Sequence, residues 1–170
     1  MDALSKVFAV IVTIIAIFIV PVVNLANSHD DIVQPTVYSA TTEFVEDVRE
    51  QGKLTQDMYI SFVQKLDDTG LLYDIEMVHS HDTAVPEFDD AGKTVGVKEV
   101  ENLIYTDEIL KSVYETNGIY KFNKGDYFSV KVTNKEATLG QQMRRTVFRM
   151  SDSGARIVAQ HGGVIRDENY

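Results

Sequence analysis

A run of twenty residues without a charge, from Val7 to Ala26, constrains this chain more than any other feature of its sequence. At about 1.5 Å of rise per residue, roughly 20 apolar residues span the hydrocarbon core of a bilayer as one helix. The run therefore predicts a single transmembrane helix over 7–26, preceded by a stub over 1–6. Pro21 predicts a kink or an early end, because proline removes one helical hydrogen bond.

The charges that flank the apolar run predict its orientation. Lys6 precedes the run, whereas Asp30 and Asp31 follow it, and the next basic residue is Arg49. Because basic residues are retained on the inner side of a membrane, this distribution favours a cytoplasmic amino terminus. It predicts a single-pass protein of the cell membrane with an extracytoplasmic domain over 27–170.

A cleaved secretory signal is the alternative interpretation of the same run. The small residues over 26–28 have the spacing of a cleavage site before His29. The run is longer than the 7–15 residues of a usual signal hydrophobic region, and its amino flank is weakly basic. We therefore expect a retained anchor that contacts membrane lipid through residues 7–26.

The composition excludes several classes of function. The net charge of −10 disfavours nucleic acid as a partner, since an acidic surface repels phosphates. The chain has no cysteine, so disulfides, thiolate metal sites and thiol catalysis are excluded. It also lacks a G-x-S-x-G elbow, a phosphate-binding loop and a dinucleotide fingerprint. We expect no enzyme activity and no cofactor.

Hydrophobic periodicity predicts an α+β domain, with a helical hairpin packed on a small, mainly antiparallel sheet. Four helices are predicted, over 37–52, 56–66, 107–118 and 137–150. The first has a buried stripe of Val37, Ala40, Phe44, Val45 and Val48, and the second is capped by Thr55. The third has Ile109, Leu110, Val113 and Tyr114 facing inward, and the fourth is short and basic. Strands are predicted over 71–80, over 120–132 as a two-stranded hairpin, and over 155–170 with a bulge or bend at Gly162 and Gly163. Residues 82–101 have loop composition and predict a mobile loop.

The motif "HSHD" contains the only candidates for a metal site. His79 and His81 alternate along a strand, so both imidazoles lie on one face, and Asp82 follows them. Two histidines without a third ligand at a fixed spacing are a weak signal, and the expectation is that no metal is bound. The acidic runs "VEDVRE" and "EFDD" lack the ligand spacing of a calcium loop.

Two further sets of residues are candidates for contacts with other proteins. Arg144, Arg145 and Arg149 form the basic cluster of an acidic domain, and they could pair within the chain or with an acidic face of another subunit. Ala9, Thr13 and Ala16 are spaced by four and three residues, which places them on one face of the apolar helix, and Pro21 continues near that face. Small side chains favour close approach of membrane helices, so we expect a helix-packing face here.

The segments "MDALSKVFAVIVTIIAIFIVPV", "FVEDVREQGKLTQDMYISFVQKLDDTGLLYDIEM", "GDYFSVKVTN" and "GGVIRDENY" extend this interpretation over nearly the whole chain. The arrangement resembles small membrane-anchored proteins of clostridial-type bacteria that are similar to pseudopilins of the Tad (tight adherence) branch of type IV pilus and type II secretion machinery. The resemblance implies a cytoplasmic stub, one apolar helix and an external α+β head. It also implies pilin-like or platform membrane proteins as partners and a homo-oligomer as one possible assembly.

The chain departs from that family at the processing site. Pilins of this type have a glycine before the apolar stretch and a glutamate soon after it begins, whereas here the first glycine is Gly52 and the first glutamate is Glu43. A filament subunit and an uncleaved accessory component therefore both remain open. The expected function is non-enzymatic assembly or secretion, and the alternative is a membrane-tethered domain that senses a ligand or adheres.

Overall fold

The computed structural model describes residues 3–88, 94–115, 118–138, 141–142, 145–146 and 157–167. Its elements in chain order are α1 (Ala3–Gln51), β1 (Lys53–Thr55), α2 (Gln56–Asp67), β2 (Tyr73–Phe88), β3 (Thr94–Tyr105), α3 (Thr106–Glu115), β4 (Ile119–Lys121), β5 (Tyr127–Asn134) and β6 (Val158–Val164). The fold is α+β, and its strands pair in antiparallel fashion in a sheet of order β3-β2-β5-β6 and in a small sheet of β1 and β4. The predicted fold class is therefore confirmed at this level.

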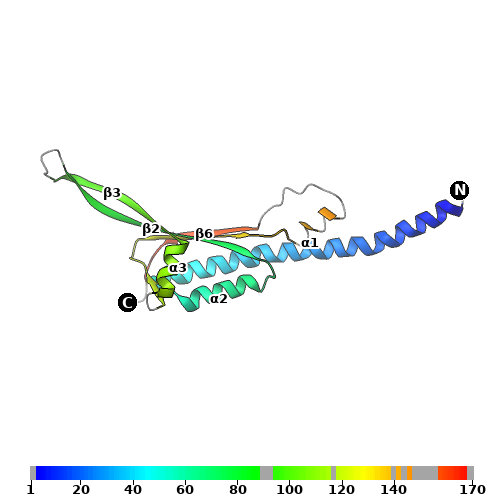
Figure 1. Ribbon diagram of the computed structural model, residues 1–170, viewed down its shortest axis with the longest axis horizontal. Helices are drawn as coiled ribbons and strands as arrows, with labels where there is room; N and C mark the ends of the chain where they lie inside the picture. Colours follow the sequence, from blue (N-terminus) through cyan, green and yellow to red (C-terminus); the bar gives the residue numbers. More distant parts are fainter. Residues whose placement is uncertain are drawn as a thin grey trace.

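Helix α1 is a single element of 49 residues. Its first half extends away from the head, and its second half lies along the four-stranded sheet (Figure 1). The helix continues through Pro21 and Pro35, so of the two outcomes predicted at Pro21, the early end is wrong and the kink stays a prediction. One proline removes only one hydrogen bond, and the turns on both sides of it keep theirs. The two helices predicted over 7–26 and 37–52 are parts of this one helix.

The core lies between the second half of α1 and the sheet. Its buried side chains on α1 are Val33, Val37, Ala40, Phe44, Val45 and Val48, and those on the sheet are Met77, Phe128, Val130, Val132 and Ala159. The α1 stripe confirms the predicted periodicity at every predicted position. Residues of β5 alternate between buried and outward-facing, as the sequence predicts.

Helix α2 packs on the side of α1 that faces away from the sheet (Figure 1). The Phe44 ring stacks on that of Phe62 with centroids 4.3 Å apart and meets Phe128 edge-on at 6.4 Å. The predicted pair of helices is thus present, but of these two helices only α1 packs on the four-stranded sheet. Thr55 caps α2 as predicted, since its Oγ1 accepts a hydrogen bond from the Met58 N–H.

Two β predictions are wrong. Residues 82–101 were predicted as a mobile loop, but 82–88 of β2 and 94–101 of β3 pair as antiparallel strands that extend beyond the head (Figure 1). Residues 89–93 lie outside the described residues. The segment 120–132 was predicted as one hairpin, but β4 pairs with β1, and β5 pairs with β2 and β6. The turn between β4 and β5 therefore joins two different sheets.

Helix α3 follows β3 directly and is fixed to β2 at its start. The Met77 N–H donates to Thr106 Oγ1 at 2.7 Å, and that hydroxyl donates to the Met77 carbonyl. Ile109 and Val113 are buried as predicted, whereas Tyr114 is exposed and was wrongly placed inward. In a helix of 10 residues only a narrow stripe reaches the core, and Tyr114 lies at its edge.

Gly162 and Gly163 do not break β6, because its register with β5 is continuous from Val158 to Val164. They provide space on the two faces of the strand. A Cβ on Gly163 would lie 2.5 Å from Cζ of Arg49, and one on Gly162 would lie 2.7 Å from the Tyr127 hydroxyl. Gly163 therefore allows the last turn of α1 to contact the sheet closely, whereas Gly162 makes room for the Tyr127 side chain of β5 on the other face.

Candidate functional site

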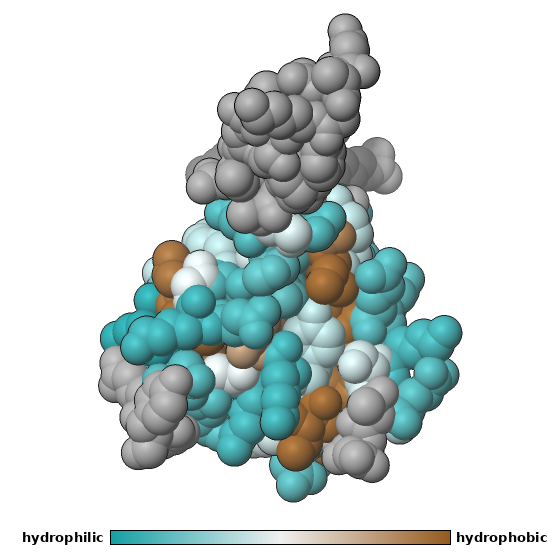
Figure 2. All heavy atoms as spheres, turned by 90° about the vertical axis from the view of Figure 1, so that its left-hand side faces the viewer, coloured by the Kyte–Doolittle hydropathy of each residue, from teal (hydrophilic) through white to brown (hydrophobic). Residues whose placement is uncertain are grey.

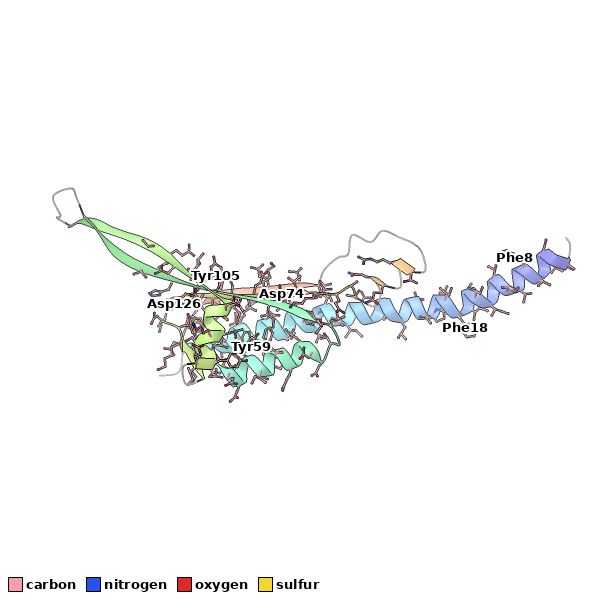
Figure 3. The ribbon with its side chains drawn as sticks, viewed as in Figure 1. Phe8, Phe18, Tyr59, Asp74, Tyr105 and Asp126 are labelled. Carbon is pink, nitrogen blue, oxygen red and sulfur yellow. The ribbon has the colours of Figure 1, made fainter. Side chains whose placement is uncertain are left out.

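The first half of α1 presents a continuous apolar surface that nothing in the described chain covers. Phe8 and Phe18 are 70% and 71% exposed, and Figure 3 shows both on the extended part of the helix. The 18 residues from Ser5 to Val22 are long and apolar enough to cross a membrane, and none of them is buried. By length and composition this segment can serve as a membrane-spanning anchor.

The residues predicted to form a helix-packing face lie on this surface. Ala9, Thr13, Ala16 and Pro21 are all exposed. The Thr13 hydroxyl donates to the Ala9 carbonyl at 2.8 Å, so the helix satisfies its own polar group. This bond keeps the face free of unpaired donors in an apolar medium, and its contact with another helix stays a prediction.

A second candidate site lies at the far end of the head, where the base of the β2–β3 hairpin meets α3 and β4. Nε2 of His79 lies 2.9 Å from one oxygen of Asp126, and Nδ1 of His81 lies 2.5 Å from the other. The Asp126 carboxylate therefore accepts from both imidazoles. Nδ1 of His79 lies 2.7 Å from the Tyr120 hydroxyl, and its ring is held edge-on against Phe122.

An open pocket of about 900 Å³ adjoins this cluster. Its walls come from β2, β3, α3, β4 and the start of the following turn, and they consist of His79, His81, Asn102, Leu103, Ile104, Glu108, Ser112, Ile119, Tyr120, Lys121 and Asn123. His79 is buried, whereas the His81 side chain is 37% exposed. Figure 3 labels Asp126 at the end of the head opposite the extended part of α1. The cluster is thus buried on one side and accessible on the other.

The charges of this cluster are set by its hydrogen bonds. Burial raises the pKa of Asp126, but hydrogen bonds from His81, the Asn123 N–H and His79 outweigh it and hold the pKa below the usual value. Burial, together with the Asp126 and Glu108 charges, raises the pKa of Tyr120 to about 12. The carboxylate is therefore ionised and the phenol neutral over the physiological range.

The structure brings together only part of the predicted metal candidates. His79 and His81 share one face of β2, as predicted, and both contact Asp126. Asp82 is exposed and faces the other way, because adjacent strand residues alternate between faces. Among the described residues, no group of three or more His, Asp or Glu side chains is arranged around a common point as metal ligands.

The predicted basic cluster falls largely outside the described residues. Arg144 and Arg149 are not described, and Arg145 is exposed. Within the predicted helix over 137–150, only the pairs 141–142 and 145–146 are described as helical. The partner-contact role of this cluster stays a prediction.

A charged cluster joins the end of α1 to β6 and to Arg166, which follows β6. This cluster was not predicted from the sequence. Glu46 accepts hydrogen bonds from His161 at 2.9 Å, from Arg166 at 2.8 Å and from Arg49. The Arg49 Nε–H also donates to the Val164 carbonyl at 3.0 Å. The hydrogen bond from His161 and the two arginines hold the pKa of Glu46 below its usual value, although burial raises it. This cluster fastens β6 to α1.

Sequence reasoning also missed Asp126 and Tyr120. Asp126 belongs to the turn between β4 and β5, where an aspartate is expected for local reasons, and it does accept from the nearby Asn123 N–H. Its contacts with the two histidines span 45 and 47 residues of sequence. Only the pairing of β2 with β5 brings them together, and that register is not readable from either strand alone.

Comparison with known proteins does not extend these observations. The chain matches no protein-family model, no curated protein and no solved structure. The exposed apolar half of α1 and the pocket beside His79 are therefore the two features of the described residues from which a function can be inferred.

Proposed function

We propose that this chain is a non-enzymatic, membrane-anchored pilin-like or accessory subunit of a Tad or type IV pilus-like assembly or secretion apparatus. The observation that carries the proposal is the division of α1 into two halves. The first half exposes its apolar side chains in all directions, and the second half buries one stripe against the sheet. A subunit of this shape can hold its head outside a membrane while its apolar half contacts other helices.

The exposed half is well suited to contacts both with lipid and with neighbouring helices. Without a hydrophobic drive between helices in lipid, association depends on close packing, and small side chains permit it. Ala9, Thr13 and Ala16 supply such a strip among larger neighbours such as Ile15. The amino terminus lies in the cytoplasm and the head is extracytoplasmic in this proposal, because Lys6 precedes the span and Asp31 follows it.

The experiment compares co-purification of the full chain with other membrane proteins after gentle solubilisation. Ala9→Leu combined with Ala16→Leu enlarges the packing strip and is expected to reduce co-purification. Ile15→Leu is the matched control, since Ile15 is also exposed on the apolar half and the change preserves its volume. Circular dichroism of each variant checks that the head stays folded.

The outcome separates an assembly helix from a simple anchor. An anchor needs only apolar length, so unchanged co-purification of the double variant would contradict the assembly role. Proteolysis of intact cells tests the orientation independently, and a head that is degraded only after permeabilisation would reverse it.

A membrane-tethered domain that senses a ligand is the second candidate. The observation that favours it is the pocket beside His79, which combines imidazole, carboxylate, amide and hydroxyl groups at one opening. A ligand-sensing domain would retain its function when the apolar half is replaced by a leucine helix of equal length, whereas an assembly subunit would not.

A further inference from the structure

We propose that the pocket beside His79 binds a small organic amine as its ammonium ion. The proposal names the ligand class for the ligand-sensing candidate and rests on that candidate, whereas the pilin-like function does not depend on it. The volume of about 900 Å³ lies within the range of about 300–1,000 Å³ that is usual for small-molecule sites. The ligand class follows from the hydrogen bonds that the side chains of the wall can still make.

The Asp126 carboxylate fixes the protons of the neighbouring rings. An ionised carboxylate only accepts hydrogen bonds, so the ring nitrogens of His79 and His81 that face Asp126 both carry protons. In its neutral form His79 then accepts at Nδ1, and the Tyr120 hydroxyl 2.7 Å away donates to it. The phenol keeps this proton because its pKa is raised to about 12. Tyr120 therefore offers the pocket an acceptor oxygen but no donor.

His81 and Asn102 provide two further acceptors in the wall of the pocket. Since Nδ1 of neutral His81 donates to Asp126, Nε2 is an acceptor, and no described residue forms a hydrogen bond with it. Asn102 donates from Nδ2 to the Thr83 hydroxyl at 3.2 Å, which leaves its side-chain carbonyl oxygen as an acceptor. Such a wall selects a ligand that donates hydrogen bonds, as ammonium and hydroxyl groups do.

The charges around Tyr120 favour an ammonium group over a hydroxyl group. The carboxylates of Asp126 and Glu108 both raise the pKa of Tyr120, so its oxygen lies in a negative field. Lys121 also lines the pocket, but it is exposed and alternates with Tyr120 along β4, so the two side chains leave the strand on opposite faces. A cation is therefore attracted to the Tyr120 side of the pocket, and an anion is repelled.

The rest of the wall can contact the carbon chain of an amine. Leu103 and Ile119 line the pocket and are 45% and 39% exposed, and Ile104 lines it and packs against the core. An alkyl chain laid over these side chains removes apolar surface from water on both partners. An alkylammonium ion thus meets both requirements of the wall, since it combines a charged donor with an apolar chain.

The test is a calorimetric titration of n-butylamine into the full chain in detergent micelles, with the micelles alone as the blank. n-Butanol and butyrate are the matched probes, because they keep an apolar chain and replace the ammonium by a neutral donor or by an anion. We expect saturable binding of n-butylamine, affinity for n-butanol weaker by about five- to ten-fold, and no binding of butyrate. Absence of saturable amine binding, or equal affinity for the three probes, overturns the proposal.

Variants place the ammonium in the pocket. Glu108→Gln removes one charge at nearly constant volume and should weaken amine binding by about five-fold. Tyr120→Phe removes an acceptor and should also weaken it. Glu115→Gln is the matched control, since Glu115 lies on α3 but is not part of the described wall. Wild-type affinity in Glu108→Gln contradicts the proposal, and circular dichroism checks that each variant is folded.

The amine titration and the test of ligand sensing can fail separately. Replacement of the apolar half by a leucine helix tests sensing without any amine, and the titration measures binding without any readout of sensing. A chain that tolerates the leucine helix but does not bind n-butylamine would keep the sensing role and refute the ligand class. A chain that binds n-butylamine but requires its native apolar half would keep the site and refute the sensing role.

Discussion

Replacement of Gly163 by alanine tests how tightly α1 is fastened to the sheet. The new methyl carbon would lie 2.5 Å from Cζ of Arg49, so the flexible Arg49 side chain must move. It would then lose its hydrogen bond to the Val164 carbonyl, now 3.0 Å long, and its contact with Glu46. A hydrogen bond to a charged group contributes about 1.5–3 kcal/mol. Alanine stabilises the folded state by about 0.4–1 kcal/mol because it restricts the unfolded chain, so the free energy of unfolding should fall by about 1–2 kcal/mol in total.

Urea unfolding of the full chain in detergent, followed by circular dichroism, measures this loss as a change in the free energy of unfolding. The three atoms nearest to the new methyl carbon all belong to Arg49, so Gly163→Ala should not lower the free energy of unfolding in an Arg49→Ala background. Gly70→Ala is the control, because Gly70 has a φ of +74° with nothing within 4 Å. It should cost about 1–2 kcal/mol in both backgrounds. Equal losses for Gly163→Ala in both backgrounds would refute the role of Arg49.

Two further predictions concern the head. Thr55→Ala removes the acceptor for the Met58 N–H and should lower the free energy of unfolding by about 1 kcal/mol. Thr55→Ser keeps a hydroxyl acceptor and should lower the free energy of unfolding much less. Equal losses in the two variants would contradict the role of Thr55 as a cap. The pKa of Glu46 is lower in the folded chain than its ordinary value of 4.5. The contribution of Glu46 to the free energy of unfolding is therefore present above about pH 4.5 and is lost as the pH falls through the pKa of the folded chain. The free energy of unfolding of Glu46→Gln, measured as a function of pH, should be lower than that of the wild type at neutral pH and equal to it in acid. A difference between the two chains that does not change with pH would contradict the stabilising role of the Glu46 carboxylate.

The helices could be predicted because their signals are local. The stripe that includes Val37 and Val45 repeats at helical spacing, and Thr55 and Gly52 mark the beginning and end of neighbouring elements. In the structure the stripe is buried, Thr55 caps α2, and Gly52 has a φ of +62° after the end of α1. The continuity of α1 could not be predicted, since the polar stretch between its halves and Pro35 both favour an interruption.

The sheet was harder to predict because pairing depends on distant segments. The alternation of β5 was evident, but its partners are β2 and β6 rather than the adjacent β4. The β2–β3 pairing was missed because Pro86 and Gly96 are typical of loops, although the pairing includes both residues. The same holds for the candidate site. The common face of His79 and His81 was predicted from the alternation along one strand, whereas the position of Asp126 depends on the register between β2 and β5.

The surface of the head at the end opposite the apolar helix is mainly hydrophilic, with apolar side chains confined to separate patches (Figure 2). This distribution has a practical consequence for any preparation of the protein. Detergent is needed to cover the apolar half of α1, whereas the far end of the head should remain in contact with water. Binding experiments at the pocket beside His79 can therefore be carried out on micelle-bound protein.

Helix α1 is continuous through both of its prolines, so no loop separates its apolar half from the half that packs on the sheet. At about 1.5 Å per residue, its 49 residues form a rod about 74 Å long. A tilt of about 10° at the apolar end displaces the opposite end of such a rod by about 13 Å. Because the sheet and α2 are packed on the same rod, they would follow this movement as one body. Small angular changes at the anchor would thus become large displacements of the head, and a flexible linker inserted between the two halves should remove that coupling.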